Sequence, residues 1–416
     1  GKGVLICVAP QILYAEDTNG DHRADKQQVL YEGLRAGNQQ HRANGLRWGL
    51  DHWIHLANGD SGGKLRSLQT GESFDIAGRD FRIHPRTGAM ELTSGTSQYG
   101  RSRDNQGNWF GGSNSEPAWH YVLDEKFQSR NRFIRSVSPR NVISATPGAA
   151  PVFPTSQTLE RFNDFDRADR FTSACSTEVS RDDAASQAFV YVCEPVHNLV
   201  HRAELTQDGA TFRSQRAPGE EQAEFLTSTD NWFRPVMVRF GPDDALWIAD
   251  MYRQVIEHPE WIPMDWQTRI DHLGGNDRGR IYRVIENTNK ATQDSPWKHV
   301  RNLPLPTLVA SLDHANGVFR DMVQQELVER HDVAAIPLLK ELYSSPKWRA
   351  ARIPIVYLLR ELNGLDESFV NRALDDNCFS IHSLQAALSI FQESPALRKR
   401  LDSWVQTFDL TDTEAL

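Results

Sequence analysis

The sequence is short of cysteine and of long apolar runs, and both shortages narrow the classes of protein it can represent. Its four cysteines, Cys7, Cys175, Cys193 and Cys378, form no C-x-x-C pair and no C-x-x-C-H haem attachment site. No run of about 18 apolar residues occurs, which argues against a transmembrane helix within this sequence. The opening GKGVLICVAP lacks the basic region and cleavage site of a signal peptide, and we expect the sequence to begin inside a domain.

Acidic residues outnumber basic ones, 55 to 46. The formal net charge is -9, and the arginines are scattered and form no basic stripe. Nucleic acid is therefore not expected as a partner. With 416 residues, the chain exceeds the usual size of one compact core, so we predict one large all-β domain and a smaller second domain.

Two of the cysteines are suitably spaced for a disulfide. Cys175 and Cys193 lie 18 positions apart, which is a comfortable loop for such a bond. A disulfide is expected if the protein is exported to an oxidising compartment, and the alternative is a pair of buried thiols.

A hairpin pattern recurs in the first ~290 residues, where a polar turn is followed by an aromatic-bearing strand that ends in Asn or Asp. The three clearest copies are Gly45–Asn58, Asp104–Asn114 and Phe240–Asp250. Diverged hairpins of this kind are typical of β-propeller blades, and their irregular spacing predicts long loops between them.

Beyond a polar, proline-containing segment the apolar spacing becomes helical. We predict a propeller over residues 1–290, a linker over 291–304 and helical pairs over 305–416. The unit of roughly 30–40 residues indicates HEAT-like repeats, and an unrelated helical bundle is the alternative. The apolar positions assigned to the three helical pairs are Leu308, Leu312, Val318, Met322, Leu327, Ile336, Leu338, Leu339, Leu342, Ile353, Val356, Leu359, Phe369, Leu374, Leu384, Leu388 and Phe391.

An acidic loop near the start has the spacing of a calcium site. Side-chain oxygens fall at loop positions 1, 3, 5 and 9, and a main-chain carbonyl falls at position 7; the residues are Asp17, Asn19, Asp21, Asp25 and Arg23. Gln28 occupies position 12, where a full EF-hand loop has Glu. We predict Ca²⁺ here in a stiffening role, and a turn capped by its own side chains is the alternative.

Several long segments carry a resemblance to a known family. They are Asp17–Asp25, His41–Asp51, Asn108–Asn114, Phe171–Cys175, Val192–Arg202, Ser228–Val236, Gly241–Arg253, His258–Pro263 and Arg278–Arg283. Together they resemble the "membrane-bound dehydrogenase" propellers of planctomycetes and their relatives, and the resemblance covers nearly the whole sequence. Members of that family carry a propeller, HEAT-like repeats and a c-type cytochrome domain. The resemblance implies a propeller of the six-bladed type, incomplete in its first blade here, with the cytochrome absent from this sequence.

That family is distantly similar to the soluble sugar dehydrogenases that bind pyrroloquinoline quinone (PQQ) and calcium. Their catalytic histidine lies eight residues before a Gly-Pro-Asp turn, and His41 lies eight residues before Gly49-Leu50-Asp51. The similarity implies that His41 is the base for oxidation of a sugar or alcohol hydroxyl, with PQQ as cofactor and the cytochrome as electron acceptor. A periplasmic or otherwise exported location follows from the same comparison.

A quinone cofactor needs its carboxylates held, and arginine forks suit carboxylates. The residues expected to ring the axial mouth are Arg202, Arg234, Arg253, His201, Asp230 and Asp250. Each has a structural alternative: a hydrogen-bonded histidine, an arginine stacked on an aromatic ring, or an aspartate that caps a turn. The tryptophans are predicted to lie mainly between blades, with any exposed ones free to stack on sugar rings.

Two other functions remain open at this stage. One is a calcium-dependent propeller hydrolase or lactonase, with an axial metal held by residues such as Asn114 and Asp250. The other is a non-enzymatic module in which the propeller binds a glycan or a protein and the helical repeats bind a partner.

Overall fold

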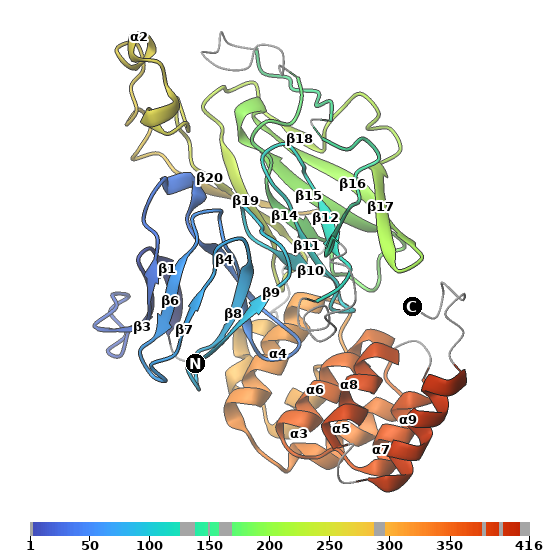
Figure 1. The fold of residues 1–416 in the computed structure, drawn as a ribbon. Coiled ribbons are helices and arrows are strands. Elements are labelled where there is room, and N and C mark those ends of the chain that lie inside the picture. Colours follow the sequence, from blue (N-terminus) through green and yellow to red (C-terminus); the bar gives the residue numbers. More distant parts are fainter. Residues whose placement is uncertain are drawn as a thin grey trace.

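The computed structural model describes residues 3–124, 138–148, 150–157, 169–286, 296–376, 380–390 and 394–407. Phe391 and Cys378 lie outside these residues. Figure 1 shows two layers, with the β-sheets in one and helices α3–α9 beneath them. The sheets form a β-propeller, as the sequence predicted.

The strands of the described residues form five antiparallel sheets. The first contains β1 (Val4–Val8), β2 (Gln11–Glu16), β3 (Lys26–Leu34), β6 (Gly63–Ser67) and β7 (Ser73–Asp75). The second contains β4 (Asn44–Trp48), β5 (Ile54–Ala57), β8 (Asp80–His84) and β9 (Ala89–Thr93). The third contains β10 (Ser102–Arg103), β11 (Trp109–Gly111), β12 (Trp119–Tyr121) and β13 (Arg140–Val142).

The last two sheets differ in size. The fourth contains β14 (Cys175–Val179), β15 (Ala188–Glu194), β16 (Leu199–Asp208), β17 (Thr211–Arg216) and the short β18 (Leu226–Thr227), which pairs with β16. The fifth contains β19 (Pro235–Phe240), β20 (Leu246–Asp250) and β21 (Arg280–Val284).

The five blades formed by the described residues correct the six-bladed prediction. The β6–β7 hairpin forms no blade of its own, because β6 pairs with β3. The β4–β5 hairpin, which lies between β3 and β6 in the sequence, belongs to the second sheet. The first sheet consequently has five strands, whereas we expected an incomplete first blade. Sequence spacing could not reveal this pairing, because strand partners are set by tertiary contacts.

Successive blades pack closely at their inner strands. The second and third sheets approach at Gly45, where an added Cβ would lie 2.4 Å from the Gly100 Cα. With a φ of +72°, Gly45 also adopts a conformation that side chains disfavour, so a glycine is required on both grounds. Strand β14 contacts β10, β11 and β19, which joins the third, fourth and fifth sheets.

The helices follow in consecutive pairs. They are η5 (Pro296–Asn302), α3 (Leu305–Ala310), α4 (Gly317–Arg330), α5 (Ala335–Ser344), η6 (Arg349–Ala351), α6 (Arg352–Glu361), α7 (Glu367–Leu374), α8 (Ser380–Ile390) and α9 (Pro395–Thr407). Neighbouring pairs stack, since α3 contacts α5, α4 contacts α6, and α6 contacts α8. This arrangement is compatible with helical repeats. No helix within the described ranges is both long and apolar enough to span a bilayer.

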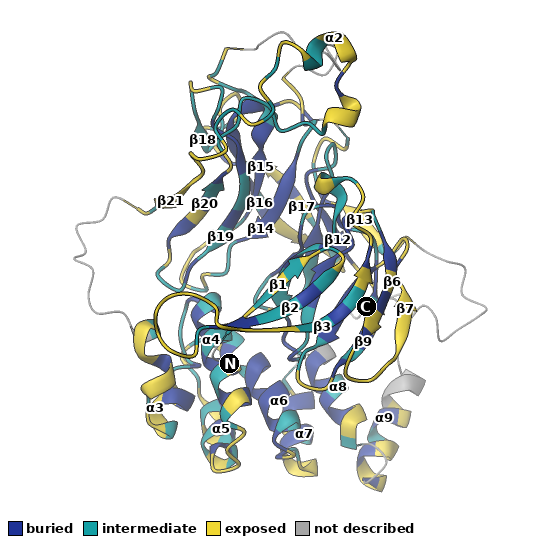
Figure 2. Cartoon of the chain, turned by 90° about the vertical axis from the view of Figure 1, so that its left-hand side faces the viewer, coloured by how far each residue is buried: buried dark blue, intermediate teal, exposed yellow. Residues whose placement is uncertain are grey.

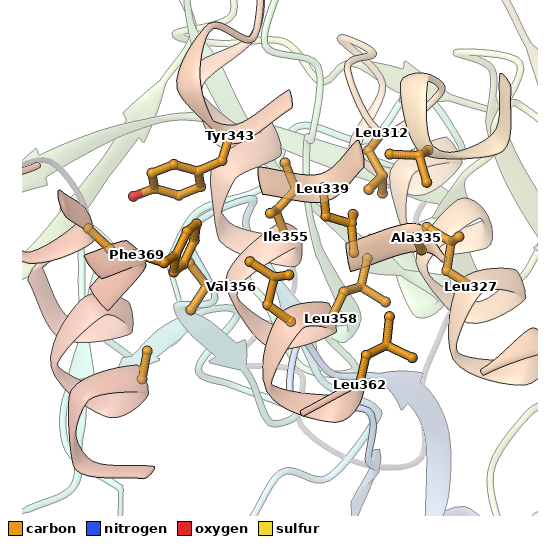
Figure 3. Packing of buried hydrophobic residues seen from close by; sticks show 14 of the residues in the cluster. Leu312, Leu327, Ala335, Leu339, Tyr343, Ile355, Val356, Leu358, Leu362 and Phe369 are labelled. Atoms are coloured by element: carbon orange, nitrogen blue, oxygen red, sulfur yellow. The ribbon is translucent and has the colours of Figure 1, made fainter. Parts of the chain in front are cut away.

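Figure 3 shows the apolar core of this helical layer, with Leu339, Ile355 and Leu358 at its centre. The sequence assigned Val318 and Met322 to this core, but α4 buries Phe319 and Val323 in their place. The sequence pattern indicated the wrong buried face of α4. The side of α4 opposite the apolar core packs against the propeller, so polar side chains such as Gln324 are buried there as well.

Candidate functional site

A cavity of about 640 Å³ opens at the end of the propeller that carries α2 (Met264–Gln267). Figures 1 and 2 place α2 on the far side of the sheets from α3–α9. The volume lies within the range of small-molecule sites, about 300–1,000 Å³. The lining residues are Gln40, His41, Tyr99, Asn114, Pro154, Ser156, Gln157, Thr172, Ser173, Val196, His197, Asn198, Asn231, Arg234, Gln254, Val255, Ile256, Glu257, Trp261, Trp266, Arg269 and Ile270. We call this the cavity end of the propeller.

His41, the predicted base, lines this cavity. It ends the short helix η1 (Gln39–His41), and its side chain remains about one third exposed. The imidazole Nδ1 lies 3.7 Å from the Asp60 carboxylate, and Nε2 lies 3.5 Å from Nε2 of Gln98. Since the Gln98 Oε1 accepts the main-chain N–H of Asn114, its amide nitrogen points toward His41. This network assigns the acceptor role to His41 Nε2 and places the ring proton of the neutral tautomer on Nδ1, facing Asp60.

The backbone beside this pair is shaped by a glycine. An added Cβ at Gly59 would lie 2.1 Å from the Arg42 carbonyl oxygen and 2.8 Å from that of His41. The φ of Gly59 is +71°, and that of Asp60 is +69°. This turn fits only a residue without a side chain at position 59, and it brings the Asp60 carboxylate toward the imidazole.

A hydrogen-bonded cluster forms the floor of the cavity. Glu194 is fully buried, and its Oε1 accepts the Ser173 hydroxyl at 2.5 Å and Nδ1–H of His197 at 3.1 Å. His197 Nε2 in turn accepts the Asp169 N–H at 3.0 Å. With each group engaged in this way, Ser173 and His197 hold the floor rigid. Both ring nitrogens of His197 and the hydroxyl hydrogen of Ser173 are therefore engaged within this cluster.

The segment between β20 and β21 supplies an aromatic wall. Trp261, at the end of η4 (Pro259–Trp261), is 57% exposed, and Trp266 lies in α2 beneath the guanidinium of Arg269. The side-chain amide of Gln40 donates to the Ile256 carbonyl, which ties this segment to η1. Tyr99 completes the lining, and burial raises the pKa of its hydroxyl, which is therefore protonated at neutral pH.

Arg234 lines the cavity, but its guanidinium hydrogen-bonds to main-chain carbonyls of the cavity wall. Its Nε donates to the Arg253 carbonyl, and Nη2 donates to the Gln254 carbonyl. Its Nη1 donates to the carbonyls of Pro195 and Val196. The guanidinium thus joins η3 (Pro195–His197) to the start of the aromatic wall.

The other predicted mouth residues lie elsewhere. Arg202 pairs with Glu220 and packs over Phe189 and Phe225. Arg253 donates through Nη1 to the carbonyls of Met251, Tyr252 and Gly275. Neither lines the cavity, so the structure does not assemble the three-arginine ring that we expected.

His201 and Asp250 likewise face structural partners. His201 Nδ1 lies 2.7 Å from the buried Glu224 carboxylate, away from the cavity lining. Asp250 accepts the main-chain N–H groups of Arg234 and Tyr252, each at 2.8 Å. The carboxylate of Asp230 accepts the Trp232 N–H. Of Asn114 and Asp250, proposed together as ligands of an axial metal, only Asn114 lines the cavity.

The acidic loop adopts the capped-turn arrangement. Asp17 accepts the N–H groups of Asn19, Gly20 and His22. The other acidic side chains behave similarly: Asp21 accepts the Arg23 N–H, and Asp25 accepts both the N–H and the hydroxyl of Thr18. Within the described part of the chain, no group of three or more His, Cys, Asp or Glu residues could hold a metal ion. Calcium binding here stays a prediction.

Sequence reasoning missed most of the lining. Tyr99, Asn231, Gln254 and Glu257 come from loops, and Trp266 comes from the short helix α2; these segments share no repeat. The one available signal was the aromatic density of residues 258–266, which carry two tryptophans outside any strand.

Three comparisons place the chain among known proteins. A family model described as "Domain of unknown function (DUF7133)" matches residues 1–288. No curated protein matches the sequence. Among solved structures, a chain from Thermus thermophilus, provisionally described as an oxidoreductase (glucose dehydrogenase), is 16% identical with a TM-score of 0.28. That match covers 60% of this chain and 77% of the other.

Proposed function

We propose that this chain, which belongs to that family of unknown function, is an oxidoreductase whose cavity binds a sugar or an alcohol as substrate. The observation that carries the proposal is His41, which lines the cavity and has the Asp60 carboxylate 3.7 Å from its Nδ1. The Gln98 amide meets the His41 Nε2 only at 3.5 Å, a long contact that a substrate hydroxyl can replace. A histidine so arranged is suited to remove a proton from a hydroxyl group.

In the proposed reaction, His41 Nε2 accepts the proton of a substrate hydroxyl while hydride leaves the carbon for a two-electron acceptor. The imidazolium that forms would be stabilised by Asp60, 3.7 Å from Nδ1. Before substrate binds, Gln98 holds the ring orientation through an amide that is itself fixed by the Asn114 N–H. The Tyr99 hydroxyl, protonated at neutral pH, is available as a hydrogen-bond donor to the substrate.

The remaining lining suits a neutral, polyhydroxylated ligand. The amide side chains of Gln40, Asn114, Gln157, Asn231 and Gln254 line the cavity, and amides donate and accept hydrogen bonds with hydroxyl groups. Indole faces such as that of Trp261 match the apolar faces of sugar rings, which also carry hydroxyls at their edges.

The side chains that line the cavity do not fit PQQ. PQQ carries three carboxylates, whereas the cationic side chains in the described lining are Arg234 and Arg269. The Arg234 guanidinium donates to four main-chain carbonyls, and Arg269 lies over Trp266. The lining also includes the carboxylate of Glu257, which would repel an anion. We therefore derive no step through PQQ. Calcium rests on the spacing of the acidic loop, and the cytochrome partner and the exported location rest on the family resemblance; all three stay predictions.

The proposal is tested by calorimetric titration with neutral sugars, polyols, an acidic sugar and PQQ with Ca²⁺, followed by dye-linked oxidation assays on any ligand that binds. We expect a neutral sugar or polyol to bind and to be oxidised. His41→Asn should lower turnover by about 10²–10⁴-fold, while affinity changes by less than about threefold.

The matched control is His22→Asn, which alters an exposed histidine with φ of +66° in the acidic loop, a conformation that asparagine tolerates. His22→Asn should leave turnover unchanged. Failure of every neutral sugar and polyol to bind would overturn the proposal, as would full turnover in His41→Asn.

A glycan-binding module is the second candidate, favoured by the exposure of Trp261 at the cavity rim. This candidate predicts that a sugar binds the wild-type protein but is not oxidised with any electron acceptor. The same titration and assay therefore separate the two candidates.

A further inference from the structure

Two thiols lie opposite each other directly beneath the cavity floor. Cys175 on β14 and Cys193 on β15 are partners in the antiparallel ladder. Both are buried in one apolar cluster, and both are free thiols in this structure. The Cys175 thiol donates a weak hydrogen bond to the Val236 carbonyl of the neighbouring blade, 3.5 Å away.

Their placement meets the geometric requirement of a disulfide. Residues directly opposite in an antiparallel pair have Cα atoms about 4.5–5.5 Å apart. Disulfides span Cα separations of about 4.4–6.8 Å, so the two sulfurs can join with little movement of the strands. The ladder register shifts between Cys175 and Glu178, and this bulge leaves the β14 end that carries Cys175 room to adjust.

We propose that Cys175 and Cys193 form a disulfide that clamps the floor of the cavity. Ser173 lies two residues before Cys175, and Glu194 directly follows Cys193. These two neighbours already share the 2.5 Å hydrogen bond that holds the floor together. The bond would therefore add a covalent link between the same two strand ends.

The reaction is a thiol–disulfide exchange with a small-molecule disulfide such as oxidised glutathione. The sulfur–sulfur bond of the small disulfide breaks, and a new one forms between Cys175 and Cys193. The two electrons lost by the protein thiols reduce the small disulfide, and both protons end on the two small thiols released. Burial raises the pKa of the Cys193 thiol, so we expect the exchange to be slow in the folded protein and fast during folding.

The test refolds the full chain with and without oxidised glutathione, blocks free thiols with maleimide under denaturing conditions, and maps the peptides by mass spectrometry. We expect oxidised wild-type protein to yield one linked pair, Cys175 with Cys193, and a melting temperature above that of the reduced protein. In Cys193→Ser the increase should vanish, and Cys175 should become blockable.

Cys7→Ser is the matched control and should keep both the linked peptide and the increase in melting temperature. Maleimide on both Cys175 and Cys193 in the oxidised wild-type protein would overturn the proposal, as would a link to any other cysteine. Because this readout uses the wild-type protein, it does not depend on whether a variant folds. It is also independent of ligand binding, so the proposal stands or falls separately from the oxidoreductase assignment.

Discussion

The two ends of the propeller are built in different ways, although the same blades supply both. The cavity end is made of long segments without a common pattern, and its lining mixes side-chain amides with hydroxyls, imidazoles, two arginines and one glutamate. The opposite end, which we call the helix-facing end, consists of short turns that meet α4. The turns that contact α4 or its capping residue Asn316 lie within 48–53, 103–108, 181–183 and 241–244.

At the helix-facing end, one face of α4 provides a partner for each turn. Asp321 binds Arg103 at 2.6 Å and Arg181 at 2.5 Å. Gln324 accepts the Trp48 indole N–H and donates to the Leu50 carbonyl. Gly317 lies so close to its turn that an added Cβ would be 1.9 Å from the Asn105 Oδ1. Several turns at this end thus share partners on one helix, whereas the segments that line the cavity share none.

The largest effect is expected for Asp321→Ala. Removing this carboxylate leaves Arg103 and Arg181 buried beside each other without their shared anion. The loss should be about 3–5 kcal/mol of unfolding free energy, measured by denaturant titration. Sugar affinity at the cavity end should be unchanged under conditions where the variant is folded.

The control for that variant is Asp265→Ala, which removes an exposed carboxylate from α2 at the cavity end. It should cost less than about 0.5 kcal/mol. Equal stability of Asp321→Ala and wild type would show that the ion cluster does not hold the two layers together.

A smaller effect is expected at a second contact of the helix-facing end. Glu361 lies 3.4 Å from His52 Nδ1 and 2.9 Å from Arg86 Nη2. The hydrogen bond from His52, opposed by burial and helped by Arg86, lowers the pKa of Glu361 to about 2. Since the folded-state pKa is depressed, this stabilisation is present above about pH 4.5 and is lost as the pH falls toward 2.

Glu361→Gln should therefore cost about 1–3 kcal/mol at pH 7, and the difference should shrink to less than about 0.5 kcal/mol by pH 2, where half of the Glu361 carboxyl is protonated. The measurement is the difference in denaturation midpoint between the two proteins over pH 2–7. A constant difference across that range would contradict the charge-based explanation.

Sequence patterns predicted the repeated hairpins and the helical character of the C-terminal region, but they failed where tertiary partners decide, as on α4. The three hairpins beginning near Gly45, Asp104 and Phe240 were recognisable because each repeats one turn and one strand. His41 was reached through one local match, and the structure places it in the cavity. Arg202 was assigned to the mouth from its place in a strand, but Glu220 and two aromatic rings hold it elsewhere.

The smallest effect concerns the cavity end and its exposed tryptophan. Trp261 is 57% exposed on a short helix that the structure places at the cavity rim. Trp261→Ala should leave stability unchanged, because little apolar area is uncovered that was not already in water. It should weaken sugar binding about tenfold, equivalent to about 1.4 kcal/mol, through loss of ring stacking. Trp247→Ala removes a tryptophan that is 38% exposed and does not line the cavity, and it should leave affinity unaltered. Equal weakening by both substitutions would mean that the loss is not specific to the rim, and the aromatic wall would then have no direct part in recognition.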